Sequence, residues 1–378
     1  MTDKQGSDKK RSKVFQRSGS PLFGQFPVLG AEYDIAQNVH ELGSGTYGMV
    51  MSAKHAATGT AVALKRIKLP SLEDGKERLR MEEFTRREMD VLQKLGQPGH
   101  PNIVRLLEVR RDIQDTCIYL VFEYVDNDLL GIVEHAESYH WSCGQIAGYM
   151  KDLFEAVAYC HQHGVMHRDI KCENILVTRE GVVKLADFGM AREMIPDFAR
   201  YTNKVTTLWT RAPELLLGAT EYTDRIDVWS AVCVVLHCLL RRPMLAADTE
   251  EKQLRVIYEL CGTPQGASRG KWAPELVSAI HKSTAHIRDA PLPNVIRSRL
   301  KDVKLRRDLF TDEAIGLIEA GLKLNPQERP PIAELLRHPW FARAYEPFLR
   351  YRFPVGQRTA TVRKDHHHHQ SKNKYAKK

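Results

Sequence analysis

Four polar side chains lie within one short stretch, HRDIKCENILVTREGVVKLADFG, which spans residues 167–189. The stretch holds two β-branched or apolar runs, 175–177 and 182–185, separated by the turn-like sequence TREG, which ends in glycine. Two such runs around a short loop with a glycine predict a β-hairpin. Because a hairpin returns to where it starts, Asn174 and Asp187 are expected side by side at one end.

The same end of the hairpin carries a carboxylate and an ammonium, because Asp169 and Lys171 come just before the first run. In proteins, Mg²⁺ is usually held by one or two side-chain oxygens together with substrate phosphates. The stretch therefore predicts a site for Mg²⁺ and phosphate. The alternative interpretation is a solvated hairpin with ordinary surface charges.

Length and composition indicate a large globular chain. Its 378 residues are 43% apolar, which predicts about two or three domains or lobes. The longest apolar run, 228–240, is too short to cross a membrane and predicts a buried helix. The N-terminal residues contain no hydrophobic signal region. Seven cysteines without CxxC or Cys/His metal spacing indicate reduced thiols in the cytosol or nucleus.

The net charge of +9 belongs to the two ends of the chain. Residues 1–27 carry +4 and residues 342–378 carry +8, so the segment between them carries −3. Basic ends indicate nuclear targeting or contact with nucleic acid or acidic partners, and the alternative is that they only increase solubility. We expect a nuclear or cytoplasmic protein, with the nucleus favoured, and no specific nucleic-acid binding. The run His366–His369 is interpreted as a low-complexity tail segment.

Hydrophobic patterns divide the chain into tails and lobes. Residues 1–35 are polar and rich in Lys, Ser and Gly, which predicts a disordered basic tail, and residues 342–378 form a second basic tail. Short β-rich runs from 36 to 68, a helix over 78–95 and a strand over 117–124 predict an N-terminal lobe of about 36–124. Helical patterns follow from residue 145. The predicted fold class is α+β, with a small antiparallel N-terminal lobe and a mainly helical C-terminal lobe of about 130–341.

The sequence GSGTYGMV, residues 43–50, is rich in glycine. A dinucleotide-binding motif of this type opens a helix, but here strand-like sequence follows. The segment therefore predicts a hairpin whose backbone can lie over phosphates.

The sequence AVALK places Lys65 at the end of an apolar strand. A buried ammonium is costly without a partner, and the helix over 78–95 offers Glu88. We expect a Lys65–Glu88 pair that holds the ammonium against nucleotide phosphates. The alternative is a surface lysine and an unrelated surface glutamate.

Five motifs in this order resemble those of eukaryotic protein kinases: the Gly-rich loop (43–50), VALK (62–65), HRDIKCEN (167–174), DFG (187–189) and APE (212–214). The resemblance covers about 36–341. It also includes DVWS at 227–230 and Arg329, which would pair with Glu214.

The resemblance implies ATP and Mg²⁺ as cofactors. Asp169 would orient the substrate hydroxyl and accept its proton, and Lys171 would neutralise the transferred phosphoryl group. Asn174 and Asp187 would hold Mg²⁺.

Two further stretches resemble cyclin-dependent kinases. LVFEYVDNDL (120–129) is similar to their hinge, and YTNKVTTLWTRAPELLLG (201–218) to the activation segment of the transcription-elongation branch. The resemblance implies a proline-directed serine/threonine kinase in transcription or cell-cycle control. Its partners would be a cyclin, an upstream activating kinase and protein substrates with Ser/Thr-Pro sites, with no membrane partner.

The resemblance also implies residue roles. Phe122 would be the gatekeeper, the backbones of Glu123 and Val125 would bind adenine, and Asp128 would lie near the ribose. Arg211 would shape the pocket for proline. The implied ATP site comprises Leu42, Gly43, Gly45, Gly48, Val50, Ala63, Lys65, Glu88, Phe122, Glu123, Val125, Asp128 and Leu176.

Phosphorylation sites follow from the same resemblance. Thr202 matches the activating phosphothreonine, and Arg87, Arg168 and Arg192 match the arginines that receive its phosphate. Alternatively, the latter two arginines pair with nearby carboxylates such as that of Glu193.

Thr46 and Tyr47 match a pair of residues whose phosphorylation inhibits kinases of the family. The alternative is that both are plain loop residues. Thr220, Glu221 and Tyr222 spell a double-phosphorylation motif of mitogen-activated kinases. They follow APE, outside the activation segment, so a surface loop is expected there.

Two departures from the family pattern leave alternatives open. In EEFTRRE only Arg87 and Glu88 of the cyclin-binding signature remain, so the identity of a cyclin and the need for one are open. Thr210 stands where the family has tyrosine. This difference either alters substrate preference or is accommodated by local repacking. A cyclin-independent, mitogen-activated-like kinase is the main alternative function. A pseudokinase scaffold is disfavoured, because Lys65, Asp169, Asn174 and Asp187 are all present.

Overall fold

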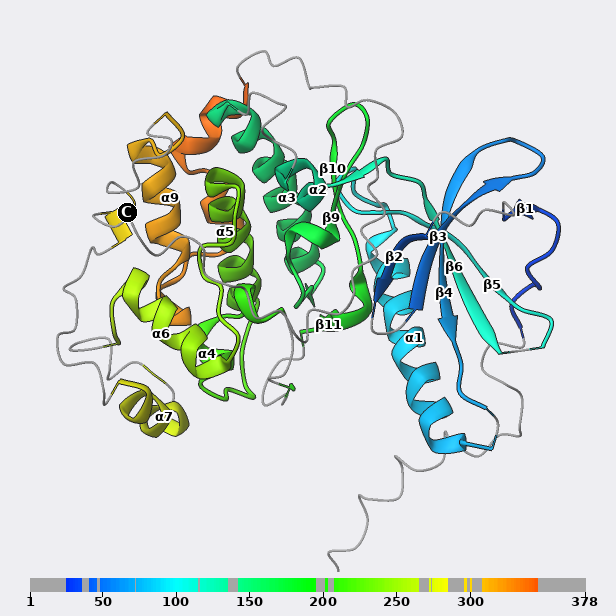
Figure 1. Cartoon of the computed structure of the whole chain (residues 1–378), viewed down its shortest axis with the longest axis horizontal. Coiled ribbons are helices and arrows are strands. Elements are labelled where there is room, and N and C mark those ends of the chain that lie inside the picture. The colour runs from blue at the N-terminus through cyan, green and yellow to red at the C-terminus, as the bar shows by residue number, and fades with distance from the viewer. Residues whose placement is uncertain are drawn as a thin grey trace, which may run out of the picture.

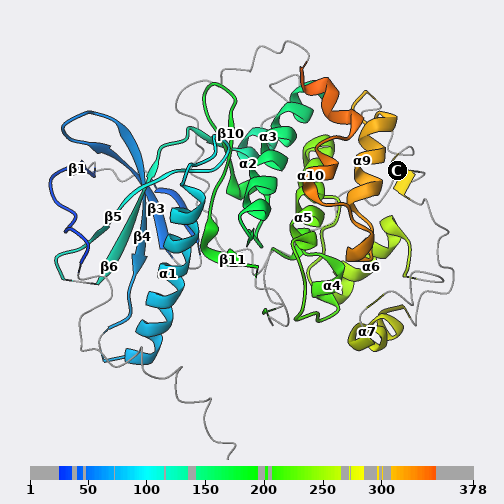
Figure 2. The same cartoon turned by 180° about the vertical axis from the view of Figure 1, so that it is seen from behind.

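Two lobes of different secondary structure lie side by side, a β-rich N-terminal lobe and a mainly helical C-terminal lobe (Figures 1 and 2). This arrangement confirms the predicted α+β bilobal fold. It is seen in a computed structural model, which describes residues 25–35, 41–45, 48–71, 73–114, 116–134, 142–194, 201–202, 207–264, 272, 274–284, 296–297, 300 and 308–345.

One antiparallel sheet forms most of the N-terminal lobe. Its order is β1-β3-β4-β6-β5, and β2 pairs with β3. Along β4, Val62 and Leu64 are buried on the outer face, so the alternating residues Ala63 and Lys65 belong to the opposite face. The strands are β1 (Tyr33–Asp34), β2 (Glu41–Gly45), β3 (Gly48–His55), β4 (Ala61–Lys68), β5 (Leu106–Arg111) and β6 (Cys117–Glu123).

The long helix α1 (Gly75–Leu95) runs beside this sheet (Figure 1). It begins three residues earlier than predicted because Asp74 caps it, accepting a hydrogen bond from the Glu77 backbone nitrogen at 3.3 Å. Its buried residues recur at helical spacing and include Glu88, which lies among Thr85, Val91 and Leu92. The buried side of the helix thus carries two acidic side chains, of which Glu82 pairs with Arg78 within the helix.

Helices around a buried centre form the C-terminal lobe. A capping box of Ser142 and Gln145 starts α3, and α5 is buried on nearly every side, as expected for the apolar run 228–240. No helix in the described part of the chain is long and apolar enough to span a membrane. The helices are α2 (Leu129–Glu134), α3 (Cys143–Gln162), α4 (Pro213–Leu216), α5 (Arg225–Leu240), α6 (Glu250–Cys261), α7 (Pro274–Thr284), α9 (Asp312–Gly321) and α10 (Ile332–Leu335).

The hairpin predicted at residues 175–185 is present and lies between the lobes (Figure 1). Val177 pairs with Val183 and Ile175 with Leu185, and Gly181 takes a φ of 80° in the turn. The smaller elements are β7 (Asn127–Asp128), β8 (Val165–Met166), β9 (Ile175–Val177), β10 (Val183–Leu185), β11 (Arg192–Glu193) and the 3₁₀ turns η2 (Cys172–Asn174), η3 (Phe188–Met190), η4 (Leu208–Thr210), η6 (Pro326–Glu328) and η7 (Pro339–Tyr345).

The N-terminal segment differs from the prediction of a disordered tail up to residue 35. Residues 25–35 pack on the sheet, where Val28 forms a parallel bridge with Arg111 and Tyr33 pairs with His55. The physical reason is local: Phe26 is partly buried against the main core, and Tyr33 is buried on the outer face of the sheet. Five large apolar or aromatic side chains in residues 26–35 outweigh the polar average of the tail. Residues 1–24 lie outside the described part.

A buried ion pair joins two distant parts of the C-terminal lobe. Arg329 donates to both carboxylate oxygens of Glu214, at 2.7 and 2.6 Å, and both side chains are almost fully buried. The remaining guanidinium hydrogens reach backbone oxygens of Lys323, Leu324 and Arg225. The pair expected from the sequence is therefore formed, with its polar groups satisfied.

Removal of this arginine should strongly destabilise the fold. Arg329→Leu leaves the Glu214 carboxylate buried without its partner, which costs about 3–5 kcal/mol in the free energy of unfolding. Chemical denaturation followed by circular dichroism measures the loss. Arg255→Leu is the matched control, because Arg255 pairs with Glu259 on an exposed helix face and should change stability by less than about 1 kcal/mol. Equal losses in the two variants would contradict the assignment.

Candidate functional site

One lysine joins three elements that are far apart in the sequence. Lys65 on β4 donates to Glu88 on α1 at 2.7 Å and to Asp187, just after β10, at 2.9 Å. The Glu88 side chain is fully buried and that of Lys65 is nearly so. Burial alone would lower the pKa of Lys65, but the carboxylates of Asp187 and Glu88 outweigh it and raise that pKa. The predicted Lys65–Glu88 pair is present, and the ammonium remains charged.

Asp187 is held in an unusual backbone conformation. Its φ is 60°, in the left-handed region that few side chains adopt. The Lys65 ammonium lowers the pKa of Asp187 to about 2, so this carboxylate is ionised at any physiological pH. Gly189 follows closely: a Cβ there would lie 3.2 Å from the Phe84 ring and 3.3 Å from an Asp187 oxygen. The close approach of α1 explains the glycine.

A second cluster surrounds Asp169. One of its oxygens accepts from the Asn174 amide and from Lys171, each at 3.0 Å. The other accepts from the backbone nitrogen of Thr207 at 3.1 Å and from its hydroxyl at 3.3 Å. Asn174 also donates to the Asp169 carbonyl at 2.8 Å. These contacts fix the orientation of a carboxylate that is only 8% exposed.

Helix α5 anchors the loop that carries Asp169. The two oxygens of Asp227 accept from the backbone nitrogens of His167 and Arg168, both at 2.8 Å. Asp227 also accepts from His161 at 2.9 Å. Arg168 has a φ of 68°, and these hydrogen bonds offset the strain of that conformation.

The oxygens of Asn174 and Asp187 suit Mg²⁺ in chemical type. Both hydrogen bonds of the Asn174 side chain use its nitrogen, and Asp187 uses one oxygen for Lys65, so each has an oxygen without a partner in the described part of the chain. The described residues contain no group of three or more His, Cys, Asp or Glu side chains that could hold a metal ion. A bound Mg²⁺ would take its remaining ligands from water or phosphate oxygens.

The glycine-rich segment forms the hairpin expected from the sequence. Its strands β2 and β3 pair with each other, from Glu41 opposite Met51 to Gly45 opposite Gly48. A Cβ on Gly48 would lie 2.2 Å from the Arg66 carbonyl oxygen, so only glycine fits. Thr46 and Tyr47, the predicted inhibitory sites, lie outside the described residues.

The residues expected around a nucleotide come from several strands. Leu42, Val50, Ala63 and Leu176 are partly exposed, whereas Phe122 on β6 is 9% exposed. Val50 lies opposite Lys65, and Ala63 lies opposite Phe122. The sheet therefore places Val50, Ala63 and Phe122 on the same face as Lys65, whereas Leu176 belongs to β9 of another sheet.

Two of the predicted hinge residues have further structural contacts. The Glu123 side chain accepts from Lys184 at 2.9 Å and from the Arg105 backbone nitrogen at 2.8 Å. Asp128 accepts from the backbone nitrogen of Gly131 at 2.8 Å. Val125 is buried. The Asp128 carboxylate thus supports the first turn of α2, a contact that the sequence reasoning missed.

The three predicted phosphate-receiving arginines gather near the activation segment. Burial, followed by the positive charges of Arg168 and Arg87, lowers the pKa of Arg192 to about 10. One terminal nitrogen of Arg168 is buried and has no hydrogen-bond partner among the described residues. Within the described part of the chain, Glu193 pairs with Lys94 at 2.9 Å and not with Arg168 or Arg192. The cluster therefore has an excess of positive charge.

Tyr222 connects this cluster to Thr202. The Tyr222 hydroxyl accepts from Arg168 at 2.9 Å and donates to the Thr202 carbonyl at 2.7 Å, while the Thr202 residue is exposed. Its ring also packs on Tyr201, with centroids 5.2 Å apart. The sequence predicts a surface loop here. Thr220 and Glu221 are exposed, as expected, but Tyr222 is half-buried. The one sequence feature that could have indicated the buried position of Tyr222 is that it is the only aromatic residue in GATEYTDR.

The segment after Thr207 is tied to α6. Arg211 pairs with Glu250 at 2.7 Å, and the Trp209 indole donates to the Ala247 carbonyl at 2.8 Å. The Thr210 hydroxyl donates to the Thr207 carbonyl at 3.3 Å. Thr210, which replaces a tyrosine of the family pattern, is therefore engaged within its own turn.

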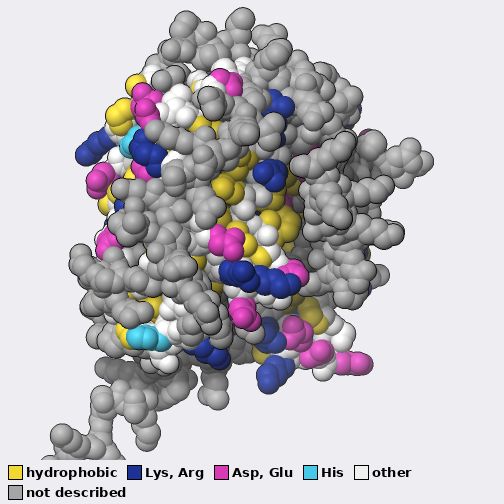
Figure 3. Space-filling model, turned by 60° about the vertical axis from the view of Figure 1, so that its left-hand side comes forward, with side chains coloured by type: hydrophobic (Ala, Val, Ile, Leu, Met, Phe, Trp, Pro, Cys, Tyr) yellow, Lys and Arg dark blue, Asp and Glu magenta, His cyan; other side chains and the backbone are white. Residues whose placement is uncertain are grey.

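Charged side chains of both signs lie next to one another on the face in Figure 3, around an area of hydrophobic side chains.

Comparison with known proteins identifies the relatives of this chain. The family model described as the protein kinase domain matches residues 36–341. The CTD kinase subunit alpha of Schizosaccharomyces pombe is 39% identical over 316 residues, which are 82% of this chain and 49% of that protein. Cyclin-dependent kinase 12 of Caenorhabditis elegans is 39% identical over 308 residues, which are 79% of this chain and 40% of that protein.

A third relative is similar over most of its length. Cyclin-dependent kinase C-3 of Oryza sativa subsp. japonica is 37% identical over 325 residues, which are 80% of this chain and 90% of that protein. By contrast, the chain spans half or less of the first two relatives.

Loss of the Tyr222 hydroxyl should loosen the segment around Thr202. Tyr222→Phe keeps the ring but removes both hydrogen bonds, each worth about 0.5–1.5 kcal/mol. Hydrogen exchange of the Tyr201 and Thr202 amides, followed by mass spectrometry, should become about 3- to 10-fold faster. The control is Tyr258→Phe, which removes a hydroxyl contact to Ser283 elsewhere in the lobe and should leave these amides unchanged. Unchanged exchange in Tyr222→Phe would show that the contact does not hold the segment.

Proposed function

Because this chain belongs to the protein kinase family and, within it, to the transcription-associated cyclin-dependent kinases, we propose that it transfers the γ-phosphoryl group of ATP to serine or threonine hydroxyls of proteins. The observation that carries the proposal is the joint contact of Lys65 with Glu88 and Asp187. It sets an ammonium and an ionised carboxylate beside the loop of Asp169. Phosphoryl transfer depends on this kind of positioning and charge stabilisation.

Asp169 is proposed to orient the substrate hydroxyl and accept its proton. The hydrogen bonds from Thr207 and Asn174 fix both of its oxygens, so the carboxylate needs no rearrangement before it acts. Lys171 is proposed to neutralise charge on the transferred group, and its contact with the same carboxylate at 3.0 Å supports this role.

Lys65 is proposed to bind ATP phosphates under the backbone of Gly43, Gly45 and Gly48. Asn174 and Asp187 would hold Mg²⁺ through their unpaired oxygens. When bound, the metal supplies positive charge to the nucleotide phosphates. Leu42, Val50, Ala63 and Leu176 would enclose the adenine, next to the backbones of Glu123 and Val125, with Phe122 at the back and Asp128 near the ribose.

The proposed substrates are Ser/Thr-Pro sites, with Arg211 shaping the proline pocket. Its ion pair with Glu250 supports this role, because it ties the segment next to Asp169 to α6. We infer a cyclin partner from the family, although α1 keeps only Arg87 and Glu88 of the usual signature. A nuclear role in transcription or the cell cycle fits the names of the relatives and the basic ends of the chain.

Thr202 is proposed as an activating phosphorylation site for an upstream kinase. A phosphate adds about −1.5 to −2 charge, and Arg87, Arg168 and Arg192 offer an excess of positive charge nearby. The arginines come from α1, the loop of Asp169 and the segment after Asp187. One phosphate would therefore connect the three elements that hold the site.

Asp169→Asn tests the catalytic assignment. We expect a loss of about 10²- to 10⁴-fold in kcat on a Ser-Pro peptide, because the proton acceptor is removed. ATP affinity, measured by calorimetry, should stay near the wild-type value. Asp187→Asn should instead weaken Mg·ATP binding. The surface variant Asp248→Asn is the control, since Asp248 pairs with Lys252 in solvent. If Asp169→Asn keeps wild-type turnover with its partner present, the proposed function is wrong.

Thr202→Ala and Arg87→Ala test the switch. Each should lower kcat strongly in the presence of a cyclin and an activating kinase, without changing the unfolding temperature. The double variant should be little worse than either single variant, because both remove one interaction. Thr220→Ala is the control, since Thr220 is an exposed threonine nearby. Fully additive losses, or full activity of Thr202→Ala, would rule out this model.

A further inference from the structure

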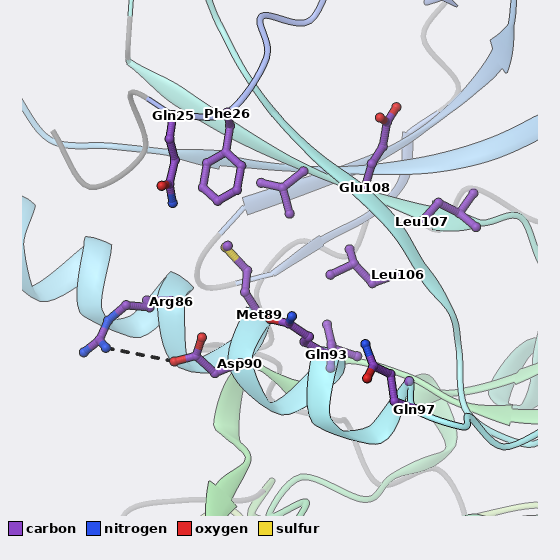
Figure 4. Close-up of a pocket in the computed structure, with 13 residues that line it drawn as sticks. Gln25, Phe26, Arg86, Met89, Asp90, Gln93, Gln97, Leu106, Leu107 and Glu108 are labelled. Atoms are coloured by element: carbon purple, nitrogen blue, oxygen red, sulfur yellow. Dashed lines mark ion pairs between the residues drawn. The ribbon is translucent and has the colours of Figure 1, made fainter.

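A pocket lies between α1 and β5 in the N-terminal lobe, and Phe26, Met89 and Leu106 are among the residues that line it (Figure 4). The described residues that line it include none from α5 or from the loop of Asp169. The contacts of that loop lie instead in the C-terminal lobe. There α5 carries two polar side chains that reach the loop, Asp227 near the start of the helix and His237 near its end.

A thiol of the loop meets an imidazole of α5. The Cys172 sulfur lies 3.4 Å from Nδ1 of His237, and the Cys238 thiol shares a hydrogen bond with the same sulfur. Cys172 is only 2% exposed, so protein encloses it. The hydrogen bond with Cys238, together with burial, raises the pKa of the Cys172 thiol well above its ordinary value. The sulfur therefore keeps its proton and can donate it to the imidazole.

This contact persists when the charge of the imidazole changes. While His237 is neutral, Nδ1 accepts the hydrogen of the thiol, and after protonation Nδ1 donates to the sulfur. Burial lowers the pKa of His237, but its hydrogen bond with Cys172 and the charges of Cys172 and Glu173 outweigh burial and raise that pKa. In both charge states one hydrogen connects the loop to the helix.

Cys172 stands between two residues that contact Asp169. Lys171 precedes it and lies 3.0 Å from the Asp169 carboxylate, and Asn174 follows it and donates to the same carboxylate at 3.0 Å. The 3₁₀ turn η2 begins at Cys172, and backbone hydrogen bonds from Asn174 to Lys171 and from Ile175 to Cys172 close it. A displacement of Cys172 would therefore move Lys171 and Asn174 with it.

Helix α5 is a fixed reference for the loop, because thirteen of its sixteen residues are buried. Asp227 accepts from the backbone nitrogens of His167 and Arg168, just before Asp169. His237 lies about 15 Å further along the helix. The helix thus holds the loop on both sides of Asp169, at residues 167–168 and at residue 172.

We propose that Cys172 and His237 form a second anchor of this loop, which keeps residues 171–174 in place beside Asp169. Both are positioning residues, because they act through Lys171 and Asn174. The effect of the anchor on turnover rests on the proposed kinase function, whereas its effect on the loop itself does not.

Two substitutions of His237 separate the hydrogen bond from packing. His237→Phe keeps a ring but offers the thiol no acceptor, whereas His237→Asn loses the ring but can place a side-chain oxygen near the position of Nδ1. In the same way, Cys172→Ala removes the donor and Cys172→Ser keeps one. The matched control is Cys233→Ala, which removes a buried thiol of the same helix that lies near Cys261.

Hydrogen exchange of the Asn174 and Ile175 amides in the full chain, followed by mass spectrometry, measures how firmly the turn is held. These amides should exchange roughly 3- to 10-fold faster in His237→Phe and in Cys172→Ala, because one hydrogen bond is lost. The double variant should be little faster than either single variant. We expect wild-type exchange in His237→Asn, Cys172→Ser and Cys233→Ala. Fast exchange in His237→Asn together with wild-type exchange in His237→Phe would mean that His237 acts through packing, which overturns the proposal.

Turnover on a Ser-Pro peptide then tests the role of the anchor in the reaction. His237→Phe should lower kcat by roughly 3- to 10-fold with an unchanged KM for ATP, and His237→Asn should restore most of the loss. Faster exchange with unchanged kcat would overturn that role. If Cys172→Ala does not fold, the two variants of the partly exposed His237 decide the outcome. The expected exchange pattern in a chain whose wild type has no kinase activity would refute the proposed function alone.

Discussion

A lysine ammonium inside an apolar sheet is costly unless carboxylates surround it, and this constraint connects the two lobes. Lys65 meets Glu88 from α1 and Asp187 from the C-terminal lobe, so one charge requires a strand, a helix and a loop to be in place together. Removing any one of the three leaves a buried or strained charge behind. The site therefore forms only when the two lobes and α1 are correctly placed.

The C-terminal lobe repeats the same principle with backbone groups. Asp227 on α5 accepts hydrogen bonds from two backbone nitrogens and so supports the left-handed conformation of Arg168. That conformation directs the next residue, Asp169, toward Asn174 and Thr207. Arg329 and Glu214 then join the following segment to the end of the lobe. Charges that are hydrogen-bonded to backbone groups support the loop of Asp169, whereas the arginine cluster near Thr202 has an excess of positive charge among the described residues.

Features that depend on local sequence could be predicted, and those that depend on distant packing could not. The hairpin of β9 and β10 and the Lys65–Glu88 pair follow from alternation, a turn glycine and the cost of a buried charge. Tyr222 could not be assigned, because its partners Arg168 and Thr202 are 54 and 20 residues away. Residues 25–35 were wrongly included in a disordered tail, because average polarity hides a few side chains that pack on a sheet edge. The roles of the site residues stay predictions.

The two sides of α1 are restrained by different kinds of contact. The face toward the sheet is held by buried residues and by the Lys65 pair, but the opposite side carries mostly charged residues whose pairs lie within the helix or in solvent. Exposed ion pairs contribute little to stability. The buried face, and above all the pair of Glu88 with Lys65, therefore does most to fix where the helix lies.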